Sequence, residues 1–112
     1  MNILVIDDNQ TILRQHELNI NKWGHKVYTA ANGLKAYEML ESTQIDIIVC
    51  DWMMPEMDGL ELCKIVRSKD FSQYIYFIIV SSKNNHEDII HALNTGADDY
   101  IVKPVCYDEL RS

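Results

Sequence analysis

The chain has 112 residues, of which 47% are hydrophobic and 24% charged, and its formal net charge is −7. This length suits one domain with its own core and excludes two, while the negative charge argues against direct binding of nucleic acid, which needs a basic surface. No apolar stretch is long enough to span a bilayer and no signal peptide opens the chain, so we expect a cytoplasmic protein without a membrane partner.

Five apolar segments, rich in β-branched residues, predict β-strands. In chain order they cover residues 2–6, 26–30, 45–51, 74–80 and 100–102. The third is almost entirely apolar and ends in a lone carboxylate, Asp51, a pattern typical of a strand buried on both faces of a parallel sheet. We therefore place this strand at the centre of the fold.

Amphipathic segments with helix-start and helix-stop residues lie between these strands. They predict helices at 10–22, 34–41 and 60–67, another that ends before Gly96, and a short one at 107–111. Asp8 or Asn9 is a suitable N-cap for the first of them. Helical spacing predicts faces turned toward the sheet, formed by Leu34, Tyr37 and Leu40 in the second helix and by Ile89, Ile90 and Leu93 in the fourth.

The alternation of strands and helices predicts an α/β fold, because right-handed crossovers leave few arrangements for such a chain. We expect a doubly wound, five-stranded parallel sheet with strand order 2-1-3-4-5 and helices on both faces. In this order the first and third strands are neighbours at the topological switch point, and their carboxyl ends form a crevice.

Three carboxylates are expected to meet in that crevice. Asp7 and Asp8 follow the first strand, and Asp51 ends the third. Their mutual repulsion is relieved most simply by a divalent cation, and oxygen ligands with open positions suit Mg²⁺. We assign Asp8 and Asp51 as direct ligands and Asp7 as a ligand through water, with the backbone carbonyl of Met53 completing the set.

Two further polar groups are expected on the same rim. Ser81 follows the fourth strand and Lys103 the fifth. A carboxylate nucleophile, a metal ion, an ammonium and a hydroxyl are the groups that phosphoryl transfer needs, since its catalysis is mainly positioning and charge neutralisation. The hypothesis is that Asp51 is phosphorylated, and that the resulting acyl phosphate is transient because water hydrolyses it.

The segments that carry these residues share a pattern with a known family. They read Val-Ile-Asp-Asp at 5–8, Asp-Trp-Met-Met-Pro-Glu-Met-Asp-Gly at 51–59, Ser81, and Gly-Ala-Asp-Asp-Tyr-Ile-Val-Lys-Pro at 96–104. In this order the chain resembles the receiver domain of two-component response regulators over essentially its whole length. The resemblance implies a flavodoxin-like fold.

The resemblance also implies roles for individual residues. Asp51 would accept a phosphoryl group from a phosphohistidine of a sensor histidine kinase or a histidine phosphotransfer protein, in a reaction that requires Mg²⁺. Lys103 would pair with the phosphoryl group, and the Lys103–Pro104 peptide bond would be cis. Ser81 would hydrogen-bond a phosphoryl oxygen, and Tyr100 would turn inward as the switch residue. The face formed by the fourth helix, fifth strand and fifth helix would then change its preference for an output domain or partner.

The chain departs from the family pattern at a few positions. Ser82 stands where the family usually has alanine, and Met53 and Lys83 occupy positions that in receivers tune the hydrolysis of the acyl phosphate. Residues 1–112 are expected to form one receiver domain whose last helix is short, as in a domain excised from a longer regulator. A covalently linked output domain and a dimer formed on phosphorylation are further expectations. The domain would catalyse its own phosphorylation and dephosphorylation and no other reaction.

Simpler explanations exist for each residue taken alone. Asp7 and Asp8 would suit a helix cap and a surface acid, Ser81 would suit a helix cap, and Tyr100 would suit edge-strand packing. The convergence of the acids on one crevice favours the metal site over these explanations.

Two other functions use similar parts. Aspartate-nucleophile phosphatases combine an acidic strand end, Mg²⁺ and a lysine, but their nucleophile lies on the first strand in an Asp-x-Asp spacing. Flavodoxins bind flavin mononucleotide on the same sheet order, through a phosphate-binding loop after the first strand. The sequence Asp7-Asp8-Asn9 at that place would repel a phosphate.

Overall fold

A computed structural model of the chain describes residues 1–69, 71, 73–107 and 110. The elements, in order, are β1 (Asn2–Ile6), α1 (Gln10–Asn21), β2 (Lys26–Ala30), α2 (Gly33–Ser42), β3 (Ile47–Asp51), α3 (Gly59–Ser68), β4 (Tyr76–Ser81), α4 (His86–Thr95) and β5 (Asp99–Val102). All neighbouring strands pair in parallel, in the order β2-β1-β3-β4-β5. The predicted doubly wound, flavodoxin-like sheet is therefore confirmed.

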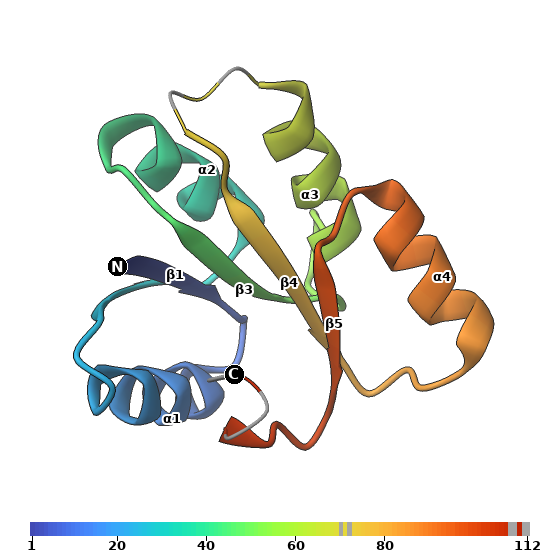
Figure 1. The fold of residues 1–112 in the computed structure, drawn as a ribbon, viewed down its shortest axis with the longest axis horizontal. Coiled ribbons are helices and arrows are strands. Elements are labelled where there is room, and N and C mark those ends of the chain that lie inside the picture. Colours follow the sequence, from blue (N-terminus) through green and yellow to red (C-terminus); the bar gives the residue numbers. More distant parts are fainter. Residues whose placement is uncertain (70, 72, 108–109, 111–112) are drawn as a thin grey trace.

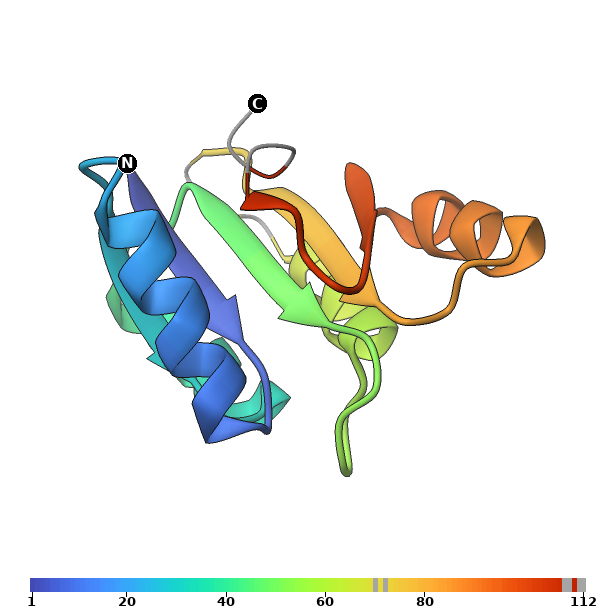
Figure 2. The ribbon, with the colours of Figure 1, turned by 90° about the horizontal axis from the view of Figure 1, so that it is seen from below.

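Helices cover both faces of the sheet, as Figures 1 and 2 show. Alternate residues of β1 divide between two cores, since successive side chains of a strand point to opposite faces. Leu4 and Ile6 belong to the core under α2, α3 and α4, whereas Ile3 and Val5 belong to the core under α1. The two apolar cores pack on opposite faces of the sheet and so position the strand ends.

In the described part of the chain, each of the helices α1 to α4 begins at the carboxyl edge of the sheet with a side chain that caps its free N–H groups. Asn9 accepts from the N–H groups of Thr11 and Ile12 at the start of α1. Asp58 and Glu61 form a reciprocal capping box at the start of α3. Asn32 and Asn85 cap α2 and α4 in the same way. The loops at the carboxyl edge are thus fixed by short-range hydrogen bonds.

Several expected positions differ in the structure. The third strand begins at Ile47 rather than at 45, and the fourth runs from Tyr76 to Ser81 rather than over 74–80. Leu34, Ile90 and Leu93 do not face the sheet but are 59%, 42% and 41% exposed. For α4 the reason is its neighbour: β5 is a four-residue edge strand, and the helix meets the core through Ala92, which is fully buried, and Ile89, which is half-buried.

The predicted helix at 107–111 falls partly on residues 108, 109 and 111, which lie outside the described residues. Of the residues around them, Val105 and Leu110 pack against the core under α1. Within the part of the chain that the structure describes, no helix combines the length and apolar character that a membrane span requires.

Candidate functional site

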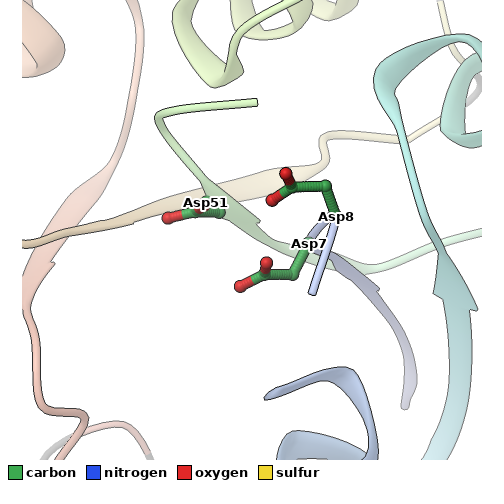
Figure 3. A group of neighbouring side chains, drawn as sticks. All are labelled: Asp7, Asp8 and Asp51. Carbon is green, nitrogen blue, oxygen red and sulfur yellow. The ribbon is translucent and has the colours of Figure 1, made fainter. Parts of the chain in front are cut away.

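The three predicted carboxylates meet at the carboxyl edge of β1 and β3. Ile6 and Cys50 are register partners in these two strands, so Asp7 and Asp51, which follow them, emerge side by side. One oxygen from each of Asp7, Asp8 and Asp51 lies within 4.8 Å of the others (Figure 3). Asp7 and Asp51 are buried, with exposed fractions of 2% and 7%, while Asp8 is exposed. We call this cluster of two buried carboxylates and one exposed carboxylate the acidic pocket.

Burial and mutual repulsion make the negative charge of this pocket costly. Burial is the main cause that raises the pKa of Asp7 to about 6, and the charges of Asp51 and Asp8 add to it. The hydrogen bond that the N–H of Asn9 donates to Asp7 Oδ1, at 2.9 Å, opposes this rise. Burial likewise raises the pKa of Asp51. Three oxygen donors with a surplus of negative charge fit a hard divalent cation such as Mg²⁺.

Lys103 supplies positive charge to the pocket. Its Nζ lies 2.9 Å from Asp51 Oδ1, and this contact lowers the pKa of Asp51 against the effect of burial. The backbone N–H of Lys103 donates to the carbonyl of Ser81 at 2.8 Å, which ties the segment after β5 to the end of β4. The Lys103–Pro104 peptide bond is cis, the isomer that the resemblance implied. The ammonium therefore reaches the expected nucleophile.

Ser81 ends β4 and is 1% exposed. Its Oγ accepts a hydrogen bond from the N–H of Lys83 at 3.0 Å, while Asn85, not Ser81, caps α4. The explanation of Ser81 as a helix cap is therefore wrong. Ser82, which follows Ser81, is exposed.

Tyr100 lies inward, with only 9% of its surface exposed. Its hydroxyl donates to the backbone carbonyl of Lys83 at 2.7 Å, and its ring meets the ring of Trp52 edge-on, with centroids 6.1 Å apart. Burial raises the pKa of the Tyr100 hydroxyl, against a hydrogen bond with the Ser81 side chain. Tyr100 is thus in contact with the residues on either side of the pocket.

The loop after β3 folds back tightly on the acceptor strand. The N–H of Gly59 donates to the carbonyl of Trp52 at 2.8 Å, and a Cβ at Gly59 would come within 2.6 Å of the carbonyl oxygen of Asp51. Only glycine fits this approach. The Met53 side chain is 58% exposed, and the role of its backbone carbonyl as a metal ligand stays a prediction.

Sequence reasoning missed two contacts around the pocket. The ammonium of Lys83 lies over the ring of Trp52, 4.4 Å from its centroid. On the α1 side, His16 Nδ1 and the hydroxyl of Tyr107 are 2.9 Å apart and line a groove of about 450 Å³ beside Lys103. Each contact joins residues far apart in the sequence, so no local pattern predicts it. The signal in the sequence was His16 itself, a polar residue at a helix position that the spacing places in the core.

Comparison with known proteins places these features in a family. A family model described as the response regulator receiver domain matches residues 3–112. The transcriptional regulatory protein AfsQ1 of Streptomyces coelicolor is 38% identical over 92% of this chain and 44% of its own length. A chemotaxis protein CheY homolog of Campylobacter jejuni is 36% identical over 93% of this chain and 82% of its own length.

Solved structures agree with these sequence matches. The receiver domain of the Francisella response regulator 1452 superposes with a TM-score of 0.90 at 35% identity, covering 97% of this chain and 88% of the other. The Vibrio cholerae chemotaxis protein CheY4 superposes with a TM-score of 0.91 at 26% identity, covering 98% and 92%. The chain spans less than half the length of AfsQ1 but most of the length of the CheY homolog.

Proposed function

Because the chain belongs to the response regulator receiver family, we propose that it is a signalling switch in which Asp51 accepts a phosphoryl group. The observation that carries this proposal is the geometry of one carboxylate: Asp51 is buried beside two other acids and lies 2.9 Å from the Lys103 ammonium. A cation on one side and an acidic cluster on the other are the surroundings that a phosphoryl acceptor needs.

The donor in this proposal is the phosphohistidine of a sensor kinase or of a phosphotransfer protein. An Asp51 carboxylate oxygen attacks phosphorus, the P–N bond to the donor histidine breaks, and an acyl phosphate forms on Asp51. A Mg²⁺ ion held by Asp8, Asp51, the Met53 carbonyl and, through water, Asp7 would supply charge neutralisation when bound. The groove lined by α1 and the segment after β5 includes Lys103, whose ammonium contacts Asp51, and we place the docking donor there.

Other residues respond to the new charge. Lys103 pairs with a phosphoryl oxygen instead of Asp51 Oδ1, and Ser81 hydrogen-bonds another. Tyr100 in its inward position then becomes the favoured state, so phosphorylation shifts a two-state equilibrium of the surface formed by α4, β5 and the segment after it. On that surface we place both the contact with an output domain or partner and a phosphorylation-induced dimer; the related AfsQ1 is named a transcriptional regulatory protein.

The direct test is incubation with acetyl phosphate and Mg²⁺, followed by intact mass measurement. We expect one added phosphoryl group in the wild type, none in Asp51→Asn, and none when Mg²⁺ is removed with a chelator. Asp99→Asn is the matched control, because Asp99 is exposed on β5 and outside the pocket. Labelling of Asp51→Asn at the wild-type level would refute the assignment of the acceptor.

Turnover of a small phosphate ester separates a switch from a phosphatase. A receiver modifies itself once, whereas an aspartate-nucleophile phosphatase turns over many molecules of a small phosphate ester. Absorbance of the purified protein tests the flavin alternative, since a flavin would colour it.

A further inference from the structure

Lys83 holds its charge away from the acidic pocket. Its ammonium lies 4.4 Å from the centroid of the Trp52 ring, within the range of a cation–π contact. Among the described residues, Asp51 pairs with Lys103, and no ion pair joins Lys83 to a carboxylate. A lysine two residues after Ser81 therefore binds an aromatic face rather than the carboxylates.

The backbone of Lys83 contacts both residues of the proposed switch. Its N–H donates to Ser81 Oγ at 3.0 Å, and its carbonyl accepts from the Tyr100 hydroxyl at 2.7 Å. A displacement of Lys83 would change the position of both hydroxyls together.

The Trp52 ring links this loop to other elements. It follows Asp51 directly, is 5% exposed, and meets Tyr100 of β5 at 87° between ring planes. It also contacts His91 of α4, with centroids 6.3 Å apart. These separations are typical of favourable aromatic pairs. The Trp52 ring is thus buried and in contact with two other elements, and the Lys83 ammonium packs against it.

We propose that Lys83 is a positioning residue: its ammonium, bound to the Trp52 ring, holds residues 82–85 in the arrangement that presents Ser81 to the phosphoryl group and keeps Tyr100 inward. This inference rests on the proposed function and adds a specific mechanism to it. It differs from a direct electrostatic role, in which the Lys83 charge would itself contact the phosphoryl group.

The two mechanisms predict different couplings with Trp52. If the lysine acts through the ring, its loss lowers the population of the competent loop, and the affinity for a phosphoryl analogue falls by the same factor. Without the ring, the lysine has nothing to bind, and its removal has no further effect. If the lysine acts directly on the phosphoryl group, its removal has the same effect with or without the ring.

The test is a double-mutant cycle with beryllium fluoride and Mg²⁺ as the probe. We compare the wild type, Lys83→Gln, Trp52→Leu and the double variant, all in the full chain. Lys83→Gln should weaken beryllium fluoride binding roughly two- to fivefold, the factor that corresponds to an exposed or half-buried cation–π contact. Lys83→Gln should have no effect in the Trp52→Leu background. Lys83→Arg should keep the wild-type affinity, because a guanidinium also stacks on indole.

Lys22→Gln is the matched control, since Lys22 is an exposed lysine after α1, at the opposite edge of the sheet. An equal effect of Lys83→Gln in both backgrounds would overturn the proposal and leave the proposed function intact. A wild-type protein that binds no beryllium fluoride would overturn both.

Trp52 is buried, so Trp52→Leu risks poor folding, and a second measurement avoids that variant. The chain has two tryptophans, and in a Trp23→Phe background the fluorescence comes from Trp52 alone. Lys83→Gln should shift its emission and Lys22→Gln should not. An unchanged emission would refute the contact, and so the proposal.

Discussion

Charged side chains lie at both edges of the sheet, the amino edge where strands begin and the carboxyl edge where they end, but their partners differ. At the amino edge Arg67 donates to the carbonyls of Gly96 and Ile75, at 2.9 and 2.7 Å, and to Asp98 at 2.6 Å. Its guanidinium also stacks on the Tyr74 ring. At the carboxyl edge three acids lie together, and the ammonium of Lys103 contacts one of them, Asp51.

The carboxylate of Asp98 is as fully used as the guanidinium. It accepts from Arg67, from the N–H of Phe77 at 2.8 Å and from the Tyr74 hydroxyl. Asp7, in contrast, has a pKa raised to about 6 by burial and by neighbouring acids. The amino edge is therefore built for stability, whereas the carboxyl edge gives up stability to keep the negative charge that the proposed Mg²⁺ ion and phosphoryl transfer would require. Breaking one edge should lower the free energy of unfolding, and neutralising the other should raise it.

The largest effect is expected for Arg67→Ala. It removes three donors and leaves the half-buried Asp98 without its cation, so the free energy of unfolding should fall by about 3 kcal/mol. Urea denaturation measures this loss. Phosphorylation of Asp51 by acetyl phosphate should be unchanged under conditions where the variant is folded.

Arg14→Ala is the control for Arg67→Ala. The Arg14 side chain is 72% exposed and pairs with Glu17 at 3.6 Å, so its loss should change stability by less than about 0.5 kcal/mol. Equal losses for the two arginines would contradict the view that the amino edge is a stabilising network.

The two edges also differ in how far the sequence predicts them. The charged groups of the carboxyl edge, Asp7, Asp8, Asp51 and Lys103, lie at strand ends. The strand pattern and strand order therefore predict where these groups lie without any knowledge of side-chain conformation. The contact of Arg67 with Asp98 depends on torsion angles of residues 31 positions apart, and no periodicity encodes it. Side-chain positions in the acidic pocket follow from topology, whereas those of the network follow from packing.

Helical spacing failed where the sheet was too narrow to cover a helix. Ile90 and Leu93 have the spacing of a buried face, but α4 packs against an edge strand of four residues, and Ala92 makes the close contact. The spacing reveals which residues share a helix face, but the width of the neighbouring sheet decides how many of them are buried. The contact of Lys83 with Trp52 was missed because it joins two loops, and no periodicity predicts how two loops pack against each other.

The next largest effect is expected for Asp7→Asn, with the opposite sign. In metal-free protein at about pH 7, the neutral side chain should raise the free energy of unfolding by about 2 kcal/mol, since it removes a buried, repelled charge. The same variant should lose most of the stabilisation that the wild type gains from Mg²⁺. Urea denaturation with and without Mg²⁺ measures both effects, and Asp99→Asn serves as the exposed control.

The pH dependence gives the sign of the Asp7 effect independently. The folded pKa of about 6 exceeds the ordinary value of 3.8, so the folded state binds the proton more tightly. The metal-free wild type should therefore lose stability as the pH rises from about 4 through about 6, by up to roughly 3 kcal/mol from this group. Burial and the charge of Lys103 lower the pKa of His16, so the contribution of His16 to stability increases as the pH rises. This contribution is the same in the wild type and in Asp7→Asn. The difference between wild type and Asp7→Asn isolates Asp7, and a flat difference would contradict its raised pKa.

The smallest effect is expected for Asp58→Ala. This variant tests whether a helix cap orders the loop at the carboxyl edge, where no network like that of Arg67 and Asp98 is described. Asp58 Oδ1 accepts from the N–H of Glu61 at 2.9 Å, and Glu61 Oε1 accepts from the N–H of Asp58 at 3.1 Å. Loss of this capping box should lower the free energy of unfolding by about 1 kcal/mol, while Asp58→Asn, which keeps an N-cap acceptor, should be nearly neutral. Because the cap holds only the start of α3, the free energy of Mg²⁺ binding should weaken by no more than the free energy of unfolding falls. A larger fall in Mg²⁺ affinity would mean that Asp58 orders the whole loop after Asp51, and the carboxyl edge would then depend on long-range order as the amino edge does.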